Sequence, residues 1–130
     1  KLMINSIDHI VLTTYRLDAC IHFYTQVLQF SLQHFGQDRI AFKFGNQKIN
    51  VHEYGKEIEP KAHLPVPGSL DICFVTQEKP ATILAHLQKH GIKSLEGPIN
   101  RTGAQGSIES IYLRDPDLNL IEIARYIENP

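Results

Sequence analysis

One order of secondary-structure elements occurs twice along this chain, and it constrains the fold more than any other feature. In the first half, residues 7–14 alternate apolar and polar side chains, which predicts a strand. Residues 17–28 carry apolar side chains at the i, i+3, i+4 and i+7 spacing of one helical face. Three short strand segments follow at about residues 30–35, 39–44 and 48–54, with glycines at the turns. The first half therefore predicts the order strand, helix, strand, strand, strand.

The second half repeats this order after a connector with three prolines. A helix is expected at residues 80–90, with Pro80 at its first position and Gly91 as its C-terminal stop. The expected strands lie at about residues 70–76, 93–96, 107–114 and 118–126. Helices this short need a sheet to cover. We therefore predict an α+β fold built from two tandem βαβββ modules, with the helices on one face.

The length of 130 residues suits one compact domain. We expect residues 1–130 to form a single domain, with module one at about 6–54, a connector at about 55–68 and module two at about 69–126.

Equivalent positions recur between the two halves, as a duplication requires. His9 in the first strand of module one matches Asp71 in module two, and Asn50 in a last strand matches Glu122. Polar residues therefore mark the first and last strands of both halves, which predicts a shared site.

Composition excludes several classes of function. With 42% apolar and 21% charged residues, the chain has the make-up of an ordinary globular protein. Thirteen basic and fourteen acidic side chains leave no electrostatic footprint for nucleic acid or an anionic membrane. No apolar run approaches the roughly 20 residues that span a bilayer. The polar first residues do not read as a signal peptide, and two cysteines are too few for a disulfide scaffold. We expect a cytoplasmic protein.

Four strand residues form a candidate metal site of nitrogen and oxygen ligands. Glu122 and Asp71 stand among apolar neighbours, where a carboxylate is costly to bury unless it is paired, protonated or bound to a metal. His9 and His52 also lie in predicted strands, and Asn50 and His52 share a face because side chains alternate along a strand. Together these residue types suit a divalent ion.

The chain resembles the vicinal oxygen chelate superfamily, which contains glyoxalase I, fosfomycin-resistance proteins and extradiol dioxygenases. The resemblance rests on Asp-His-Ile-Val-Leu at 8–12, Phe-Tyr-Thr-Gln-Val-Leu-Gln-Phe at 23–30 and Asp-Pro-Asp-Leu-Asn-Leu-Ile-Glu at 115–122, and it spans about residues 6–126. Segments 44–53, 61–63 and 97–104 further resemble the glyoxalase-domain-containing protein 5 subgroup.

The resemblance implies a curled, cup-shaped mixed sheet with outer helices that holds a divalent metal, such as nickel, zinc, manganese or iron. It places His9, Asp71 and Glu122 at ligand positions. The fourth position falls on Asn50 by strict alignment. His52, two residues on, is the better ligand chemically, and we favour it. A glyoxalase I normally has glutamate near Asn50 and histidine or glutamine near Asp71, and this chain has neither.

The implied activity is that of a small glyoxalase-like lyase or isomerase. Its substrate would chelate the metal through vicinal oxygens, and Glu122 would move the proton. Arg101 and the loop at 102–106 are candidates for a mobile lid. The resemblance also implies a homodimer.

Other interpretations remain open. The same cup could serve a binding protein that sequesters a small molecule without turnover, as in resistance proteins, or an iron(II) dioxygenase with His9, His52 and Glu122 as ligands. Glu122 could instead pair with Arg125 or Lys48. Asp71 could cap a turn. Cys73 reads as a small apolar residue rather than a nucleophile. The other histidines, out of seven, do not occupy ligand positions.

Overall fold

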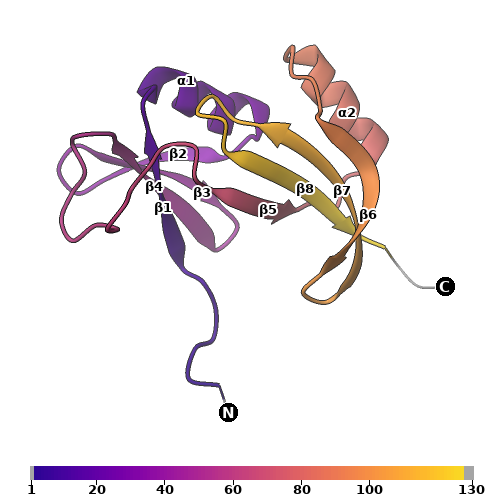
Figure 1. Cartoon of the computed structure of the whole chain (residues 1–130), viewed down its shortest axis with the longest axis horizontal. Coiled ribbons are helices and arrows are strands. Elements are labelled where there is room, and N and C mark those ends of the chain that lie inside the picture. The colour runs from indigo at the N-terminus through magenta and orange to yellow at the C-terminus, as the bar shows by residue number, and fades with distance from the viewer. Residues whose placement is uncertain (1, 128–130) are drawn as a thin grey trace. The chain divides into compact units, whose positions relative to one another are not determined.

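The computed structural model describes residues 2–127, which divide into two compact units at Pro67 and Gly68 (Figure 1). The first unit contains β1 (His9–Thr14), α1 (Leu17–His22), a π-helix η1 (Phe23–Val27), β2 (Ser31–Phe35), β3 (Arg39–Phe44) and β4 (Gln47–Glu53). The second contains β5 (Asp71–Val75), α2 (Pro80–Lys89), β6 (Glu96–Gly103), β7 (Gly106–Arg114) and β8 (Leu120–Tyr126). The predicted α+β fold with two βαβββ modules is confirmed. The ends of the predicted domain, residues 1 and 128–130, lie outside the described residues.

Each unit forms one four-stranded mixed sheet, and the two sheets have the same topology. Their strand orders are β1-β4-β3-β2 and β5-β8-β7-β6. The first and last strands of each unit pair in parallel, with Val11 opposite Asn50 and Cys73 opposite Glu122. This register makes Asn50 and Glu122 equivalent, as the sequence offsets predict.

Aromatic packing holds the first unit together. The ring of Tyr24 stacks on Phe42 of β3 at 4.9 Å between centroids, and Phe30 stacks on Phe44 at 4.4 Å. The helix predicted at 17–28 keeps α geometry only to His22. The amide of Leu28 donates to the carbonyl of Phe23 at 3.0 Å, which is the wider hydrogen bond of a π turn. Apolar spacing buries the same side chains with either pattern, so it could not reveal the change.

The second unit is packed by α2 and the inner strands. Leu87 of α2 and Ile111, Leu113 and Ile121 of β7 and β8 are almost completely buried. Within residues 2–127, no helix has the length and apolar character needed to cross a membrane.

The third strand of the second unit differs from the expectation. The predicted strand at 93–96 lies at Glu96–Gly103 instead, and the segment 102–106, expected to be a mobile lid, is the end of a hairpin with Thr102 paired to Ser107 and Gly103 to Gly106. The glycine-rich run suggested a loop, but these residues close the turn between β6 and β7.

Candidate functional site

Glu122 lies in a cavity of ≈ 340 Å³ on the sheet of the second unit. The cavity is lined by β5 through Cys73, by β6 through Arg101 and by β7 through Tyr112. Cys73 and Tyr112 are the register partners of Glu122 on its two sides, so the three side chains share one face. The largely apolar strand β8 therefore places one carboxylate, that of Glu122, in the cavity.

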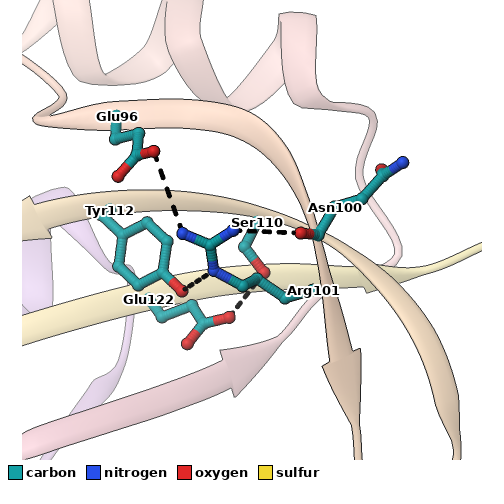
Figure 2. Close-up of polar contacts among 6 residues, drawn as sticks. All are labelled: Glu96, Asn100, Arg101, Ser110, Tyr112 and Glu122. Carbon is teal, nitrogen blue, oxygen red and sulfur yellow. Dashed lines mark hydrogen bonds and ion pairs between the residues drawn. The ribbon is translucent and has the colours of Figure 1, made fainter.

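Ser110 and Cys73 contact the Glu122 carboxylate, and Figure 2 shows the contact with Ser110. The fully buried Ser110 donates its hydroxyl to Glu122 Oε2 at 2.5 Å. Burial, followed by the charge of Glu122, raises the pKa of the Cys73 thiol to about 11, so the thiol stays protonated and hydrogen bonds to the carboxylate. A thiol with a raised pKa is a poor nucleophile near neutral pH, which agrees with the sequence-based interpretation that Cys73 is no nucleophile.

Glu122 makes no ion pair within residues 2–127. The alternative that it pairs with Arg125 or Lys48 is therefore wrong for the described part of the chain. Its carboxylate instead contacts the neutral hydroxyl of Ser110, and the side chain lines the cavity.

Arg101 extends over the same cavity (Figure 2). Its Nε donates to the hydroxyl of Tyr112 at 3.2 Å and one terminal nitrogen donates to the carbonyl of Asn100 at 3.1 Å. The other terminal nitrogen lies 3.9 Å from Glu96 Oε1, a loose ion pair. The guanidinium is thus positioned by contacts with β6 and β7 and does not belong to a mobile loop.

Asp71 lies on the cavity side of the same sheet but is exposed. It is the register partner of Leu120, one position diagonal from Glu122. The sequence suggested a buried carboxylate, and this is wrong because β5 is an edge strand. The start of β5 is fixed by Asn119, whose side-chain oxygen accepts from the amide of Leu70 at 2.9 Å. Asp71 itself caps no turn among the described residues.

The first unit contains two buried polar atoms without partners. Asn50 is 5% exposed and His52 is 6% exposed, both on β4. Within the described residues, neither Asn50 Oδ1 nor His52 Nε2 has a hydrogen-bond partner. Burial lowers the pKa of His52, and the charge of Arg39 adds to this against the opposing charge of Glu57. The imidazole is thus neutral near pH 7, the form that binds a metal.

His9 lies at the start of β1 and is partly exposed. Its Nδ1 hydrogen bonds to Asp8 Oδ2 at 2.7 Å, which lowers the pKa of the Asp8 carboxyl. A carboxylate on one ring nitrogen orients a histidine whose other nitrogen binds a metal.

The register separates His9 from His52 in the first unit. His52 is opposite Thr13, four residues along β1 from His9, which is about 13 Å of strand. Asn50 is opposite Val11 and lies diagonal to His9, just as Glu122 lies diagonal to Asp71. Asn50 therefore occupies the position equivalent to Glu122, and His52 the position equivalent to Ala124.

The donor types fit a divalent metal. Imidazole nitrogen with carboxylate or amide oxygen suits zinc, nickel, manganese or iron. The two buried polar atoms that lack partners among the described residues, Asn50 Oδ1 and His52 Nε2, are of the types that coordinate such an ion. Among residues 2–127, no group of three or more histidine, cysteine, aspartate or glutamate side chains is placed so that it could hold a metal ion.

The two sheets have the same strand order, their first and last strands pair in parallel, and polar residues stand at equivalent positions, which defines a protein built from duplicated βαβββ units. The chain belongs to the Glyoxalase/Bleomycin resistance protein/Dioxygenase superfamily, whose family model matches residues 6–123. This confirms the superfamily resemblance.

Close relatives cover nearly the whole chain. It is 54% identical over 126 residues to the glyoxalase domain-containing protein RDO1 of Mycosarcoma maydis, covering 97% of this chain and 71% of that protein. It is 49% identical over 127 residues to the virulence protein STM3117 of Salmonella typhimurium, covering 98% and 88%. The crystal structure of that virulence protein superposes with a TM-score of 0.94 over 97% of this chain and 100% of that one.

A more distant structure shares the fold. The lactoylglutathione lyase of Agrobacterium tumefaciens is 20% identical, with a TM-score of 0.71 over 92% of both chains. At this identity the likeness concerns the fold alone.

Sequence reasoning missed Ser110 and Tyr112. Both lie on β7, on the same face as Glu122, and Tyr112 is its register partner. The alternation in Ser110-Ile111-Tyr112-Leu113 was a usable signal, because polar side chains recur at every second position of a strand whose other face is apolar.

Proposed function

We propose that this protein is a small metal-dependent enzyme, a glyoxalase-like lyase or isomerase, whose substrate presents two vicinal oxygens. The observation that carries the proposal is Glu122, a carboxylate fixed by Ser110 in a ≈ 340 Å³ cavity and free of any ion pair in the described residues. Such a group is suited to take a proton from a bound substrate and return it.

The residues of this chain divide the work of proton transfer. Glu122 takes the proton from a carbon next to the substrate oxygens and delivers it to the neighbouring position. Ser110 keeps the carboxylate in one orientation, because its hydroxyl is fully buried and has little freedom to move. Cys73 stays protonated and therefore adds no competing charge to the cavity.

The predicted metal ligands are His9, His52, Asp71 and Glu122, with Asn50 as the alternative to His52. The register of β1 and β4 supports the alternative, because Asn50 and not His52 lies diagonal to His9. A divalent metal bound by them would supply Lewis-acid stabilisation of the negative charge that develops on the substrate oxygens. Support comes from the orphaned atoms of Asn50 and His52 and from the orienting contact of Asp8 on His9.

Metal analysis combined with turnover tests this proposal. Protein purified without added metal, and protein loaded with nickel or zinc, is analysed for metal and assayed for hemithioacetal isomerisation. Replacing Glu122 with Gln is expected to lower kcat by about 10²–10⁴-fold. The matched control is Glu109→Gln, since Glu109 also lies on β7 but faces away from Glu122. Absence of stoichiometric metal under every loading condition would sink the metalloenzyme proposal.

A binding protein without turnover is the second candidate. The cavity of ≈ 340 Å³ lies within the range of small-molecule sites, and neither unit alone completes a metal site within residues 2–127. Stoichiometric ligand binding that leaves the ligand chemically unchanged would favour it. Oxygen uptake with catechols would instead identify an iron(II) dioxygenase.

The proposal also includes the assembly and location that the family resemblance implies. We infer a homodimer, which sedimentation analysis tests, and a cytoplasmic location, which cell fractionation tests. A protein that sediments as a monomer at all concentrations would exclude the dimer.

A further inference from the structure

The Arg101 guanidinium has unused hydrogen-bonding capacity beside Glu122. A guanidinium carries five N–H donors. Within residues 2–127, Arg101 uses one for Tyr112 and one for Asn100, and its contact with Glu96 at 3.9 Å is too long for a charge-assisted hydrogen bond. Three donors of a fixed cation are therefore available at the cavity.

Tyr112 supplies one more donor at the same place. Its hydroxyl oxygen accepts from Arg101 Nε, so its own proton remains available to another acceptor. The guanidinium also lies 5.6 Å from the centre of the Tyr112 ring, which helps to keep it in position. The two side chains thus present a cation and a hydroxyl to one point of the cavity.

Two carboxylates lie near this point, but neither takes up the free donors of Arg101. Glu122 also lines the cavity, but its carboxylate is held by Ser110 rather than by Arg101. Glu96 is about half exposed, so its loose ion pair is worth little and can yield to a better partner. A planar guanidinium with free parallel donors matches the two oxygens of a carboxylate or phosphate.

We propose that Arg101 and Tyr112 anchor an anionic group, a carboxylate or a phosphate, of the substrate on which Glu122 acts. The proposal rests on the proposed function for the role of Glu122, and it narrows the substrate to a small anionic metabolite. One end of the substrate binds Arg101 while the vicinal oxygens lie toward Glu122. The anchor favours an anion over a neutral analogue because only the anion forms charge-assisted hydrogen bonds with the guanidinium.

The test is an NMR titration of metal-free protein at constant ionic strength. The probes are succinate, inorganic phosphate and succinamide, the last being a neutral analogue of succinate. Saturable shifts of the Arg101 Nε–H and of the Gly103 amide are expected with succinate or phosphate and not with succinamide. The tighter of the two anions identifies whether the natural group is a carboxylate or a phosphate.

Variants with opposite expected effects sharpen the test. Arg101→Gln should weaken anion binding by about tenfold or more, and Arg101→Lys should restore part of it because the charge remains but the paired donors are lost. Glu96→Gln, the control on the same β6 strand, should bind the anion about two- to threefold more tightly because a competing carboxylate is gone. Unchanged affinity in Arg101→Gln, equal shifts with succinamide, or no saturable shift at about 50 mM anion would overturn the proposal.

The same variants distinguish failure of the proposed function from failure of the anion anchor. Glu122→Gln should keep or improve anion binding while losing turnover, because it removes a negative charge without touching the anchor. Anion binding through Arg101 in a protein that shows no metal and no turnover would leave the anchor standing and reject the enzyme. Turnover that Arg101→Gln leaves intact would reject the anchor alone.

Discussion

Replacing His52 with Leu should stabilise the metal-free protein. The imidazole is 6% exposed, and its Nε2 has no hydrogen-bond partner within residues 2–127. A buried polar atom left unpaired costs about 1–3 kcal/mol. Leucine has no polar atom and a similar volume, and such shape changes cost less than about 1.5 kcal/mol. The net expectation is a gain of about 1 kcal/mol in the free energy of unfolding.

The pH dependence provides a second signature of the same residue. Burial lowers the pKa of His52 from 6.5, so the folded state binds the proton less well than the unfolded state. The stability tied to the neutral imidazole is fully present above pH 6.5 and is lost as the pH falls through the lowered folded-state pKa. The wild type should therefore lose more stability than His52→Leu on going from about pH 8 to about pH 5.

Urea unfolding with a chelator present measures both effects, and added metal should reverse the order. A metal at about 100 times its Kd adds about 2.7 kcal/mol to the protein that binds it, and the leucine variant should gain much less. The control is His34→Leu on the exposed β2 strand, which should change stability by less than about 0.5 kcal/mol. A leucine variant that is less stable than the wild type by more than about 1 kcal/mol in chelator would refute the reasoning, because Nε2 would then have a partner.

Three further perturbations test the second unit. Ser110→Ala should reduce kcat about tenfold and stability by about 1.5–3 kcal/mol, because the Glu122 carboxylate loses its buried donor. Steady-state kinetics and urea unfolding measure the two effects, and an unchanged kcat would show that Ser110 does not position the carboxylate. The Cys73 thiol, with its pKa raised to about 11, should react with a disulfide reagent only as the pH approaches that value. Glu122→Gln should speed the reaction at about pH 8 severalfold, because the Glu122 charge is one cause of the raised pKa. A rate equal to that of the wild type would contradict this. Gly97→Ala should destabilise the folded protein by more than about 3 kcal/mol, because φ is +114° and a Cβ would lie 2.3 Å from the Ser110 carbonyl oxygen. Gly91→Ala, at φ +71° with open space around it, should cost about 1–2 kcal/mol. Thermal unfolding of the two variants measures the difference.

Periodicity predicted the elements well where one face is apolar. The α2 helix begins at Pro80 as expected and ends within one residue of the expected position, and β3 occupies the predicted range. The prediction failed at β6, which was expected at 93–96 and lies at Glu96–Gly103, and at 102–106, which was expected to be a mobile loop and closes the β6–β7 hairpin. Glycines mark a turn, but they do not show whether the residues beside it pair as strands.

The candidate site was predictable only in part. The duplication located Glu122 and its equivalent Asn50, because a repeated frame fixes register as well as element order. Burial was harder to predict. Asp71 is exposed although its neighbours are apolar, since exposure depends on the place of the strand in the sheet, which local sequence does not encode. The choice of ligands remains a prediction.

The equivalent positions of the two units differ, and the residues at these positions of the first unit lower the free energy of unfolding. Glu122 obtains a donor from Ser110, whereas its equivalent Asn50 and the nearby His52 are buried with polar atoms that no described residue satisfies. Each such atom costs about 1–3 kcal/mol, and a domain has only about 5–15 kcal/mol of stability. Apolar residues at these positions of β4 would remove the cost. A ligand that hydrogen bonds to these atoms, or coordinates through them, would remove the cost, so binding of a ligand should stabilise the first unit as well as the cavity around Glu122.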